Sequence, residues 1–526
     1  MRNMQWKTIV AMPLSTITLT GAMLFGALAH ADDAVIATDK GLIKGTVAAS
    51  SRSFLGIPFA QPPVGSLRWK APQTATAWTG TRDATAAGSI CPQTVTNSDG
   101  TTSVAGAENC LYLNVYTPYP LSPTKLPVMV WIHGGGFTGG SGSGYDARVL
   151  AKKANAVVVT LNYRLGALGF LAHPALTSES RDASGNYGLL DQQAAIKWVK
   201  TNIANFGGDI TKTMIFGESA GSASVCANVL SPAVAGYFQR AVMESGACTG
   251  FGFTPLATAQ SNGTTFASNV GCTDPSSAAA SCLRAVSVSA LLSASSGVST
   301  GLAFNPTVGG AVLPKMPTTA LQTQSYNKVP ILQGTNHDEG RLFTVQYEYG
   351  TPLTTTQYED MVNQQFGSNG SSVLARYPVA NYSSPTIAYA TLFTDYGFSC
   401  PARTTDKLLA PTVATYAYEF NDPNAPAAPW LPGTHLAAYH GSEIQYIFQA
   451  QDTSAFTSAQ LALSNQMIKY WATFASTGNP NASGQPAWPS YTAAGDQFLS
   501  LVPNATKPIT SFAADHQCAF WSTLGI

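Results

Sequence analysis

A serine between two glycines follows an expected strand and precedes an expected helix. The apolar residues 214–216 end abruptly at the sequence Gly-Glu-Ser-Ala-Gly (217–221), and residues 222–230, which can form a helix, follow at once. Such a strand–turn–helix junction holds the serine backbone in a strained conformation and lifts its hydroxyl oxygen clear of the sheet. The spacing therefore predicts that Ser219 is a nucleophile and that the backbone N–H of Ala220 lies beside the reacting centre.

A second Gly-x-Ser-x-Gly sequence occupies residues 297–301. It lies in a serine-rich stretch, and no apolar run that could form a strand precedes it. Because the chain has 47 glycines among 526 residues, a chance match to the pattern is expected. We therefore interpret residues 297–301 as a loop.

A glycine-rich segment follows residues 126–132 (LPVMVWI), whose near-continuous apolar character is typical of a strand buried on both faces. The segment begins His-Gly-Gly-Gly-Phe (133–137). Glycines leave backbone N–H groups bare, so these groups can stabilise negative charge that develops on a carbonyl oxygen. A flexible loop is the alternative. The order of strand, HGGG and then Gly-x-Ser-x-Gly favours the anion-stabilising loop.

Apolar runs alternate with a helical segment over the middle of the chain. The runs expected to form strands are 111–116, 126–132, 156–161, 214–216 and 330–334. Residues 189–205 have apolar side chains at helical spacing, and two glycines at 207–208 stop the helix. Strands that alternate with helices indicate an α/β fold with a large, mostly parallel sheet.

Two segments near the start of the chain lie outside this alternation. Residues 34–48 alternate in polarity in a way that predicts an early hairpin. Residues 54–69 contain prolines that rule out a helix. We expect that second segment to be extended, rich in turns and spread over the surface.

The first 31 residues have the features of a secretory signal peptide. Arg2 and Lys7 give a basic start, an apolar stretch rich in Thr, Ala and Leu follows, and Ala29-His30-Ala31 is a small-x-small cleavage site. A proline and many hydroxyl residues disfavour the alternative, a membrane anchor. We expect cleavage near Ala31, export to the periplasm or the outside of the cell, and a single folded domain over residues 32–526.

Eight cysteines in an exported chain indicate disulfides, although spacing alone does not fix the pairing. The candidate pairs are Cys91 with Cys110, Cys272 with Cys282, and Cys400 with Cys518. Cys226 and Cys248 are either bridged or buried as free thiols. Metal binding is the rival interpretation of the cysteines, but no C-x-x-C or H-x-x-x-H pair supports it.

The charge balance excludes some classes of partner. The 27 Lys and Arg residues equal the 27 Asp and Glu residues, which predicts no basic surface for nucleic acid or for an anionic membrane. After the signal peptide no segment offers 18 uninterrupted apolar residues, so we expect no membrane-spanning helix. The composition leaves the oligomeric state open.

Ten segments, in a fixed order from about residue 54 to 491, resemble the type B carboxylesterase/lipase family, which also contains cholinesterases. They are FLGIPFAQPPVGSLRW, ENCLYLNVYTP, PVMVWIHGGGF, NYRLGALGF, GNYGLLDQ, NIANFGGD, FGESAG, GTNHDEG, HGSEIQYIF, and YWATFASTGNPN with WPSY. The resemblance implies an α/β-hydrolase fold. It also implies a Ser-Glu-His triad that needs no metal and no cofactor.

The base of such a triad must follow the serine in the chain. Of the histidines that do, His435 and His440 are the two real candidates from position alone. The resemblance selects His440, which begins the family's base motif HGSEIQYIF. His435 is then interpreted as a histidine of the pocket rim or of the packing.

The acid should lie at the end of a strand, and Asp338 and Glu339 both follow the run 330–334. The family places its glutamate directly before a glycine, which selects Glu339, next to Gly340. Asp338 is then a solvated carboxylate or a brace of the loop.

The resemblance also assigns residues around the nucleophile. The oxyanion donors would be the backbone N–H groups of Gly135, Gly136 and Ala220. Glu218 and Ser245 resemble positions that support the histidine, and a buried hydrogen-bonded pair is the alternative for these two residues. Arg68 with Glu108, and Arg164 with Asp191, resemble the family's structural ion pairs.

These inferences predict an exported serine carboxylesterase for small-molecule esters. The alternatives are a lipase with a preference for long acyl chains and a non-catalytic binding relative. Such binding relatives generally lack a triad member, whereas Ser219, Glu339 and His440 are all present. Cholinesterases hold choline with a tryptophan in the loop that corresponds to residues 91–110, and this loop has no aromatic residue, so a choline ester is not expected.

Overall fold

The computed structural model describes residues 33–97, 101–180, 182–250, 252–274, 276–295, 304–428, 430–449 and 454–525. The expected signal peptide (1–31) and the second Gly-x-Ser-x-Gly sequence (297–301) lie outside the described residues. Residues 34–526 form one compact unit.

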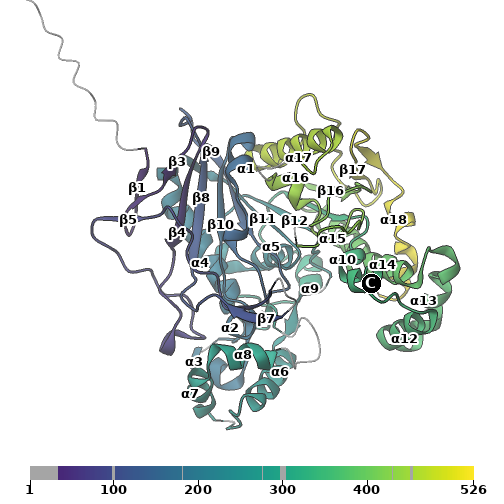
Figure 1. The fold of residues 1–526 in the computed structure, drawn as a ribbon, viewed down its shortest axis with the longest axis horizontal. Coiled ribbons are helices and arrows are strands. Elements are labelled where there is room, and N and C mark those ends of the chain that lie inside the picture. Colours follow the sequence, from purple (N-terminus) through teal and green to yellow (C-terminus); the bar gives the residue numbers. More distant parts are fainter. Residues whose placement is uncertain are drawn as a thin grey trace, which may run out of the picture. The chain divides into compact units, whose positions relative to one another are not determined.

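A sheet of 11 strands organises this unit (Figure 1). In order across the sheet the strands are β18 (Lys507–Ile509), β17 (Phe498–Leu501), β16 (Thr415–Phe420), β15 (Ile331–Asn336), β12 (Arg240–Glu244), β11 (Gly208–Glu218), β9 (Leu126–Ile132), β10 (Val157–Leu161), β8 (Tyr112–Pro118), β4 (Ser51–Pro58) and β3 (Thr46–Val47). The strands from β17 to β10 run parallel, and antiparallel strands close both edges. The expected large, mostly parallel sheet is confirmed.

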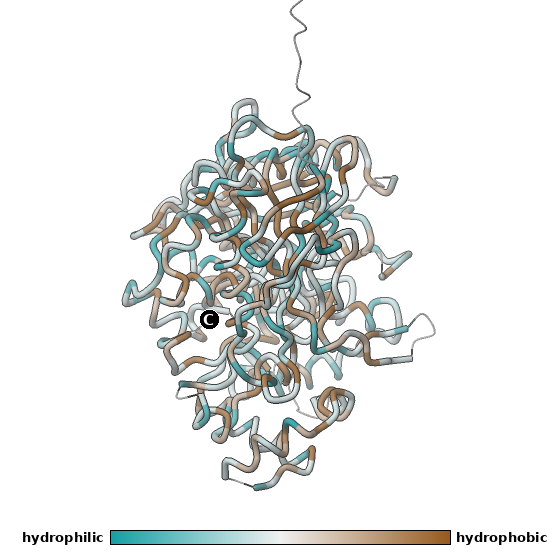
Figure 2. Tube along the Cα trace, turned by 90° about the vertical axis from the view of Figure 1, so that its left-hand side faces the viewer, coloured by the Kyte–Doolittle hydropathy of each residue, from teal (hydrophilic) through white to brown (hydrophobic). Residues whose placement is uncertain are grey.

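Helices cover both faces because side chains alternate along each strand. In β9, Val128, Val130 and Ile132 are buried in one apolar cluster, which includes α4 (Tyr187–Asn202) and α5 (Ala220–Leu230). Met129 and Trp131 point the other way, into a cluster that includes α1 (Arg148–Ala154), α16 (Ile444–Phe448) and α17 (Ser458–Thr477). Apolar stretches accordingly run through the middle of the chain trace (Figure 2).

The remaining strands and helices lie around this core. The strands are β1 (Val35–Thr38), β2 (Gly41–Lys44), β5 (Thr81–Asp83), β6 (Gln93–Thr96), β7 (Thr102–Ala105), β13 (Thr254–Pro255) and β14 (Thr307–Val308). The helices are α2 (Gly166–Phe170), α3 (Pro174–Ser180), α6 (Leu256–Asn269), α7 (Ala278–Ala285), α8 (Val288–Ser295), α9 (Pro317–Gln322), α10 (Gly340–Phe343), α11 (Val345–Glu348), α12 (Thr355–Phe366), α13 (Gly370–Arg376), α14 (Pro385–Thr394), α15 (Cys400–Leu409), α18 (Phe512–Asp515) and α19 (Cys518–Thr523). β1 and β2 pair antiparallel, as the expected early hairpin requires.

The expectation that residues 54–69 spread over the surface is wrong for much of the segment. β4 pairs with β8 inside the large sheet, and Phe54 and Ile57 are fully buried. The prolines begin only at Pro58, so the preceding residues keep the N–H groups that a strand ladder needs. Trp69 is also buried, and its indole N–H donates a hydrogen bond to the carbonyl of Ala167.

Four disulfides link segments that surround the large sheet. Three join the expected pairs, Cys91 to Cys110, Cys272 to Cys282, and Cys400 to Cys518. The fourth joins Cys226, in α5, to Cys248, which follows β12, and settles the pair that spacing left open. Within the described residues, no single helix is long and apolar enough to cross a membrane; α7 and α8 meet that criterion only as a pair bent by 103°.

The ion pair between Arg164 and Asp191 is expected to be required for stability. Two guanidinium nitrogens of Arg164 lie 2.7 Å from the two carboxylate oxygens of Asp191, whose side chain is fully buried. Arg164→Met leaves this carboxylate without its counter-charge, so we expect the free energy of unfolding to fall by about 3–5 kcal/mol. The matched control is Arg148→Met, because Arg148 and its partner Asp146 are each 43% exposed and such pairs contribute less than about 1 kcal/mol. Urea unfolding followed by tryptophan fluorescence measures both changes, and equal losses would contradict the prediction.

Candidate active site

The predicted nucleophile lies at the junction between β11 and α5. Ser219 has φ 57° and ψ −123°, a strained conformation for a residue with a side chain, and it is partly exposed. Its backbone N–H donates to the carbonyl of Glu244, at the end of the neighbouring strand β12. A side chain at Gly221 would overlap the carbonyl oxygen of Ile132, which explains the glycine at this position. The structure thus has the sharp turn that the sequence predicts.

The expected acid and base lie together at the carboxyl end of the same sheet. Glu339 follows β15, and His440 lies in the connection between β16 and α16. Nδ1 of His440 is 2.6 Å from Oε2 of Glu339, and both side chains are buried. The second carboxylate oxygen of Glu339 accepts the backbone N–H of Asn336 at 2.8 Å. This arrangement fixes the ring with Nδ1 protonated and Nε2 turned away from the acid.

The other ring nitrogen of His440 faces a second carboxylate. Nε2 lies 3.2 Å from Oε1 of Glu218, the residue before the nucleophile. Within the described part of the chain, no hydrogen bond joins His440 to the hydroxyl of Ser219. Hydrogen bonds between a base and its nucleophile are often long in a free enzyme and tighten when substrate binds.

These carboxylates determine the protonation of the base. Burial by itself lowers the pKa of His440, but Glu218 and Glu339 outweigh burial and raise the pKa to about 9. Burial raises the pKa of Glu218 to about 7, against the opposing effect of His440. Glu218 and Nε2 of His440 therefore compete for one proton, and Nε2 must lose it before it can act as a base.

The glycine-rich loop packs directly on the nucleophile. A side chain at Gly134 would place its first carbon 2.8 Å from the carbonyl oxygen of Glu218 and 3.1 Å from Cβ of Ser219. Gly135 has φ 101° and Gly136 has φ 61°, values that favour glycine. Among the described residues, no acceptor takes the N–H of Gly135, Gly136 or Ala220. These three groups are the ones predicted as oxyanion donors.

His133 braces this glycine-rich loop through contacts of its side chain and its backbone. Its Nδ1 lies 2.8 Å from the carbonyl oxygen of Gly134, and its ring stacks on Tyr163 with 4.4 Å between centroids. The hydroxyl of Tyr163 donates to the carbonyl of His133. Burial lowers the pKa of His133 to about 4, so the ring is neutral at physiological pH. A neutral, fixed ring suits a brace and not a proton carrier.

Two further buried carboxyl groups lie near the triad, and the sequence motifs did not predict them. Glu443 contacts the side-chain amide of Asn336, and Glu244 accepts the indole N–H of Trp471 at 2.7 Å. Burial raises the pKa of Glu443 to about 8 and that of Glu244 well above its ordinary value. Glu443 stands three residues after His440 in the segment HGSEIQYIF, so its signal was available. Glu244 carried no such signal.

The two residues expected to support the histidine differ in their contacts. Glu218 reaches His440 directly, as described above. The hydroxyl of Ser245 instead donates to Glu443 at 3.4 Å, and the two predicted residues do not form the hydrogen-bonded pair that was the alternative. Ser245 is thus connected to the buried carboxyl groups and not to the ring.

The rejected candidates lie elsewhere. His435 is exposed, and its backbone forms hydrogen bonds with the side chains of Tyr349 and Arg341. Asp338 lies 3.2 Å from Nδ1 of His337 and accepts the backbone N–H of Ala438. Neither side chain contacts His440 within the described residues.

Two phenylalanines flank the ring of the base. The ring centroids of Phe343 and Phe398 lie 5.0 and 4.9 Å from that of His440. Phe343 is 45% exposed, which is high for such a side chain. The surface next to the base is therefore apolar and accessible.

Comparisons with known proteins identify the family of the chain. Residues 32–521 match the Carboxylesterase family. The chain is 34% identical to a cholinesterase of Mus musculus over 549 aligned positions, which cover 95% of this chain and 88% of the relative. It is 34% identical to a fumonisin B1 esterase of Sphingopyxis macrogoltabida over 506 positions, which cover 91% and 88%. The chain therefore belongs to the carboxylesterase family, has its α/β-hydrolase fold and is a carboxylic ester hydrolase.

Proposed function

We propose that the protein is an exported serine carboxylesterase whose triad is Ser219, His440 and Glu339, within one catalytic domain over residues 32–526. The proposal rests on one observation: at one end of the sheet lie a strained serine, a histidine hydrogen-bonded to a buried glutamate, and a loop with N–H groups that have no acceptor among the described residues. In open α/β sheets ligands bind outside the carboxyl ends of the strands, which is where these residues lie.

In the proposed reaction the hydroxyl oxygen of Ser219 attacks the ester carbonyl while Nε2 of His440 takes the hydroxyl proton. The carbonyl oxygen becomes an oxyanion, and the N–H groups of Gly135, Gly136 and Ala220 stabilise its charge. His440 then gives the proton to the leaving alcohol, and an acyl-enzyme remains on Ser219. Water, activated by the same histidine, attacks the acyl-enzyme and releases the acid.

Glu339 has two tasks in this cycle. Its hydrogen bond keeps the proton of the neutral ring on Nδ1, so that Nε2 is available to the serine. Its negative charge stabilises the imidazolium that forms when Nε2 accepts the serine proton. Both tasks are performed without proton transfer to Glu339.

The substrate class follows from the surroundings of the base. The rings of Phe343 and Phe398 beside His440 favour an apolar group near the reacting carbonyl. The relatives include a cholinesterase and a fumonisin B1 esterase, so members of the family act on different esters. The aromatic-free loop 91–110 does not favour choline as the alcohol. We propose a small ester with an uncharged alcohol.

Export is supported by the four disulfides, because structural disulfides persist in oxidising compartments. The features of residues 1–31 support the same proposal.

A panel of p-nitrophenyl esters with increasing acyl length tests the proposed function. We expect turnover to be greatest with short acyl chains, and a fluorophosphonate probe to stop it by forming a phosphorus–oxygen bond to Ser219 with loss of fluoride. Mass spectrometry of the labelled peptide locates the modification. A long-chain optimum would move the assignment to a lipase. A folded protein that hydrolyses none of the esters and takes up no probe would refute the esterase proposal.

A further inference from the structure

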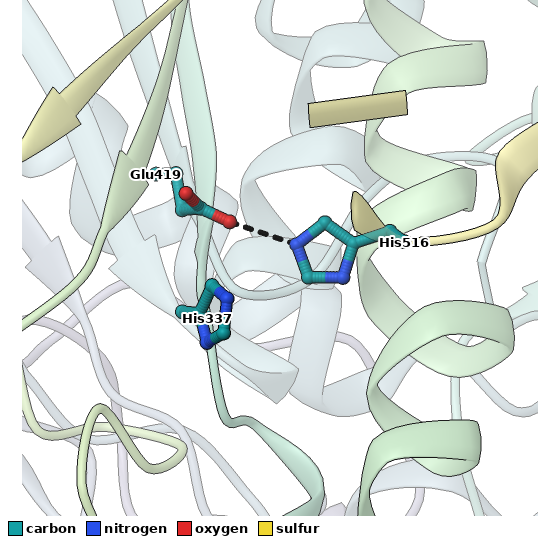
Figure 3. Close-up of side chains that lie close together, drawn as sticks. All are labelled: His337, Glu419 and His516. Carbon is teal, nitrogen blue, oxygen red and sulfur yellow. Dashed lines mark hydrogen bonds and ion pairs between the residues drawn. The ribbon is translucent and has the colours of Figure 1, made fainter. Parts of the chain in front are cut away.

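A second group of titratable side chains lies next to the same sheet and includes no member of the triad. His337 directly follows β15, Glu419 lies in β16, and His516 follows α18 (Figure 3). The side chains come from three separate parts of the chain, and one ligand atom of each lies within 4.8 Å of the other two. Figure 3 shows Glu419 pointing toward His516, with the ring of His337 beside the pair.

The fold explains why the three residues meet. β15 and β16 run parallel, with Thr335 opposite Glu419, and His337 is two residues further along. Because side chains alternate along a strand, His337 continues the face that carries Glu419. The C-terminal segment is brought to this face by Phe512, whose ring stacks on Phe498 of β17 with 3.8 Å between centroids. The disulfide from Cys400 to Cys518 fixes the same segment.

His516 has the surroundings of a metal ligand. Its Nδ1 lies 2.6 Å from Oδ1 of Asp395, and its Nε2 lies 2.7 Å from Oε1 of Glu419. A histidine that binds a metal usually donates its other ring N–H to a carboxylate, which sets the tautomer and orients the ring. Asp395 itself accepts the hydroxyl of Tyr377, and Tyr377 accepts the indole N–H of Trp521. The orientation of Nε2 is thus fixed by a chain of buried hydrogen bonds.

The charges around the two imidazoles favour a dication. Three carboxylates contact the two histidines: Glu419 and Asp395 contact His516, and Asp338 contacts His337. Glu419, Asp395 and His516 are almost fully buried, whereas the side chain of His337 is 39% exposed. The exposed edge of His337 offers a path for an ion from solvent, and the buried residues provide a site of low dielectric.

We propose that His337, Glu419 and His516 form a binding site for a divalent transition metal ion, with Zn²⁺ as the best match. Two imidazole nitrogens and one carboxylate oxygen are a ligand set that Zn²⁺ takes, with bonds of about 2.0–2.2 Å. In a tetrahedral site such ligand atoms lie about 3.3 Å apart, so Glu419 and His516 need only small side-chain movements. The ion takes the place of the proton between Nε2 of His516 and Glu419, and that proton leaves to solvent.

The site would join the C-terminus to the loop of the catalytic acid. His337 stands two residues before Glu339, and His516 stands two residues before Cys518. An ion shared by the two would hold the acid loop against the C-terminal segment. Residues 337, 419 and 516 are too far apart in the chain to form a short metal-binding motif. The sequence therefore did not indicate a metal site.

The test uses the full protein with its disulfides formed and without a histidine tag. After treatment with EDTA and dialysis, the protein is titrated with Co²⁺ and with Zn²⁺. We expect one equivalent of each ion to bind, Co²⁺ to give the visible absorption of a four- or five-coordinate ion, and Zn²⁺ to raise the thermal unfolding midpoint. These readouts do not depend on ester hydrolysis, so their failure would leave the proposed function untouched.

Three variants locate the site. His337→Asn and Glu419→Gln each remove one ligand, and each is expected to weaken Zn²⁺ binding by about 100-fold or more. His337→Asn changes a partly exposed side chain and is expected to unfold at the wild-type temperature in the absence of metal. His435→Asn is the matched control, because it removes an exposed histidine outside the cluster and should bind Zn²⁺ as the wild type does.

Two results would overturn the proposal. Wild-type protein that takes up no equivalent of either ion would show that the cluster holds only protons. Equal uptake by His337→Asn, Glu419→Gln and His435→Asn would show that the ion binds at another place.

Discussion

Replacing Ser219 with alanine is expected to lower kcat/KM for a p-nitrophenyl ester by about 10⁴-fold or more, which corresponds to about 5 kcal/mol of transition-state stabilisation. The variant has no oxygen to form the acyl-enzyme, and only the oxyanion donors and substrate binding can still act. The fold should be unaffected, because within the described residues the side chain of Ser219 makes no hydrogen bond that the change would break. Initial rates at saturating and limiting ester, with thermal unfolding beside them, measure both expectations.

Ser222→Ala is the control for this variant. Ser222 lies in the first turn of α5, is fully buried, and donates its hydroxyl to the carbonyl of Gly246 at 2.8 Å. Its loss is expected to cost about 1 kcal/mol of stability and to leave kcat nearly unchanged. Residual activity of more than a few per cent in Ser219→Ala, with the fluorophosphonate probe still forming a covalent adduct, would refute the assignment of the nucleophile.

The central strands could be predicted because burial on both faces leaves a continuous apolar run. β9 begins and ends at the predicted residues, 126 and 132. β15 extends two residues beyond the predicted run, to Asn336, because polar Thr335 and Asn336 still pair with β16. β11 begins at Gly208, well before the apolar part at 214, since its first residues are polar and the ladder with β9 is irregular there. Pairing with a neighbour, which a single sequence does not display, decides where such strands begin and end.

The triad and the oxyanion loop could be predicted because each is carried by a short segment at the end of a strand. Of the buried carboxyl groups outside the triad, the family resemblance indicated Glu218 as a support of the histidine. Glu244 and Glu443 were not predicted, since they are far apart in the chain and glutamates are mostly exposed in proteins. The same limit applies to His337, Glu419 and His516, whose proximity depends on strand register and on the docking of the C-terminus. Local motifs reveal chemistry that one loop carries, and tertiary contacts decide the rest.

Replacing Glu339 with glutamine is expected to lower kcat by about 10⁴-fold. A glutamine amide can turn its NH₂ group toward the ring, so that Nδ1 accepts a hydrogen bond and the proton moves to Nε2, where it blocks the base. The variant also lacks the charge that stabilises the imidazolium. Removal of this carboxylate lowers the pKa of His440, so the neutral ring persists to lower pH, and the acid limb of the profile of kcat/KM against pH should move to lower pH by about one pH unit.

Glu218→Gln separates the two effects. It too removes one carboxylate beside His440, so the acid limb should again move to lower pH, but Glu218 faces Nε2 at 3.2 Å and does not hold Nδ1. The rate on the alkaline plateau should therefore fall far less than in Glu339→Gln. Equal plateau losses would show that charge alone, and not control of the tautomer, is what Glu339 supplies. A large loss confined to Glu218→Gln would contradict the assignment of Glu339 as the carboxylate that orients the base.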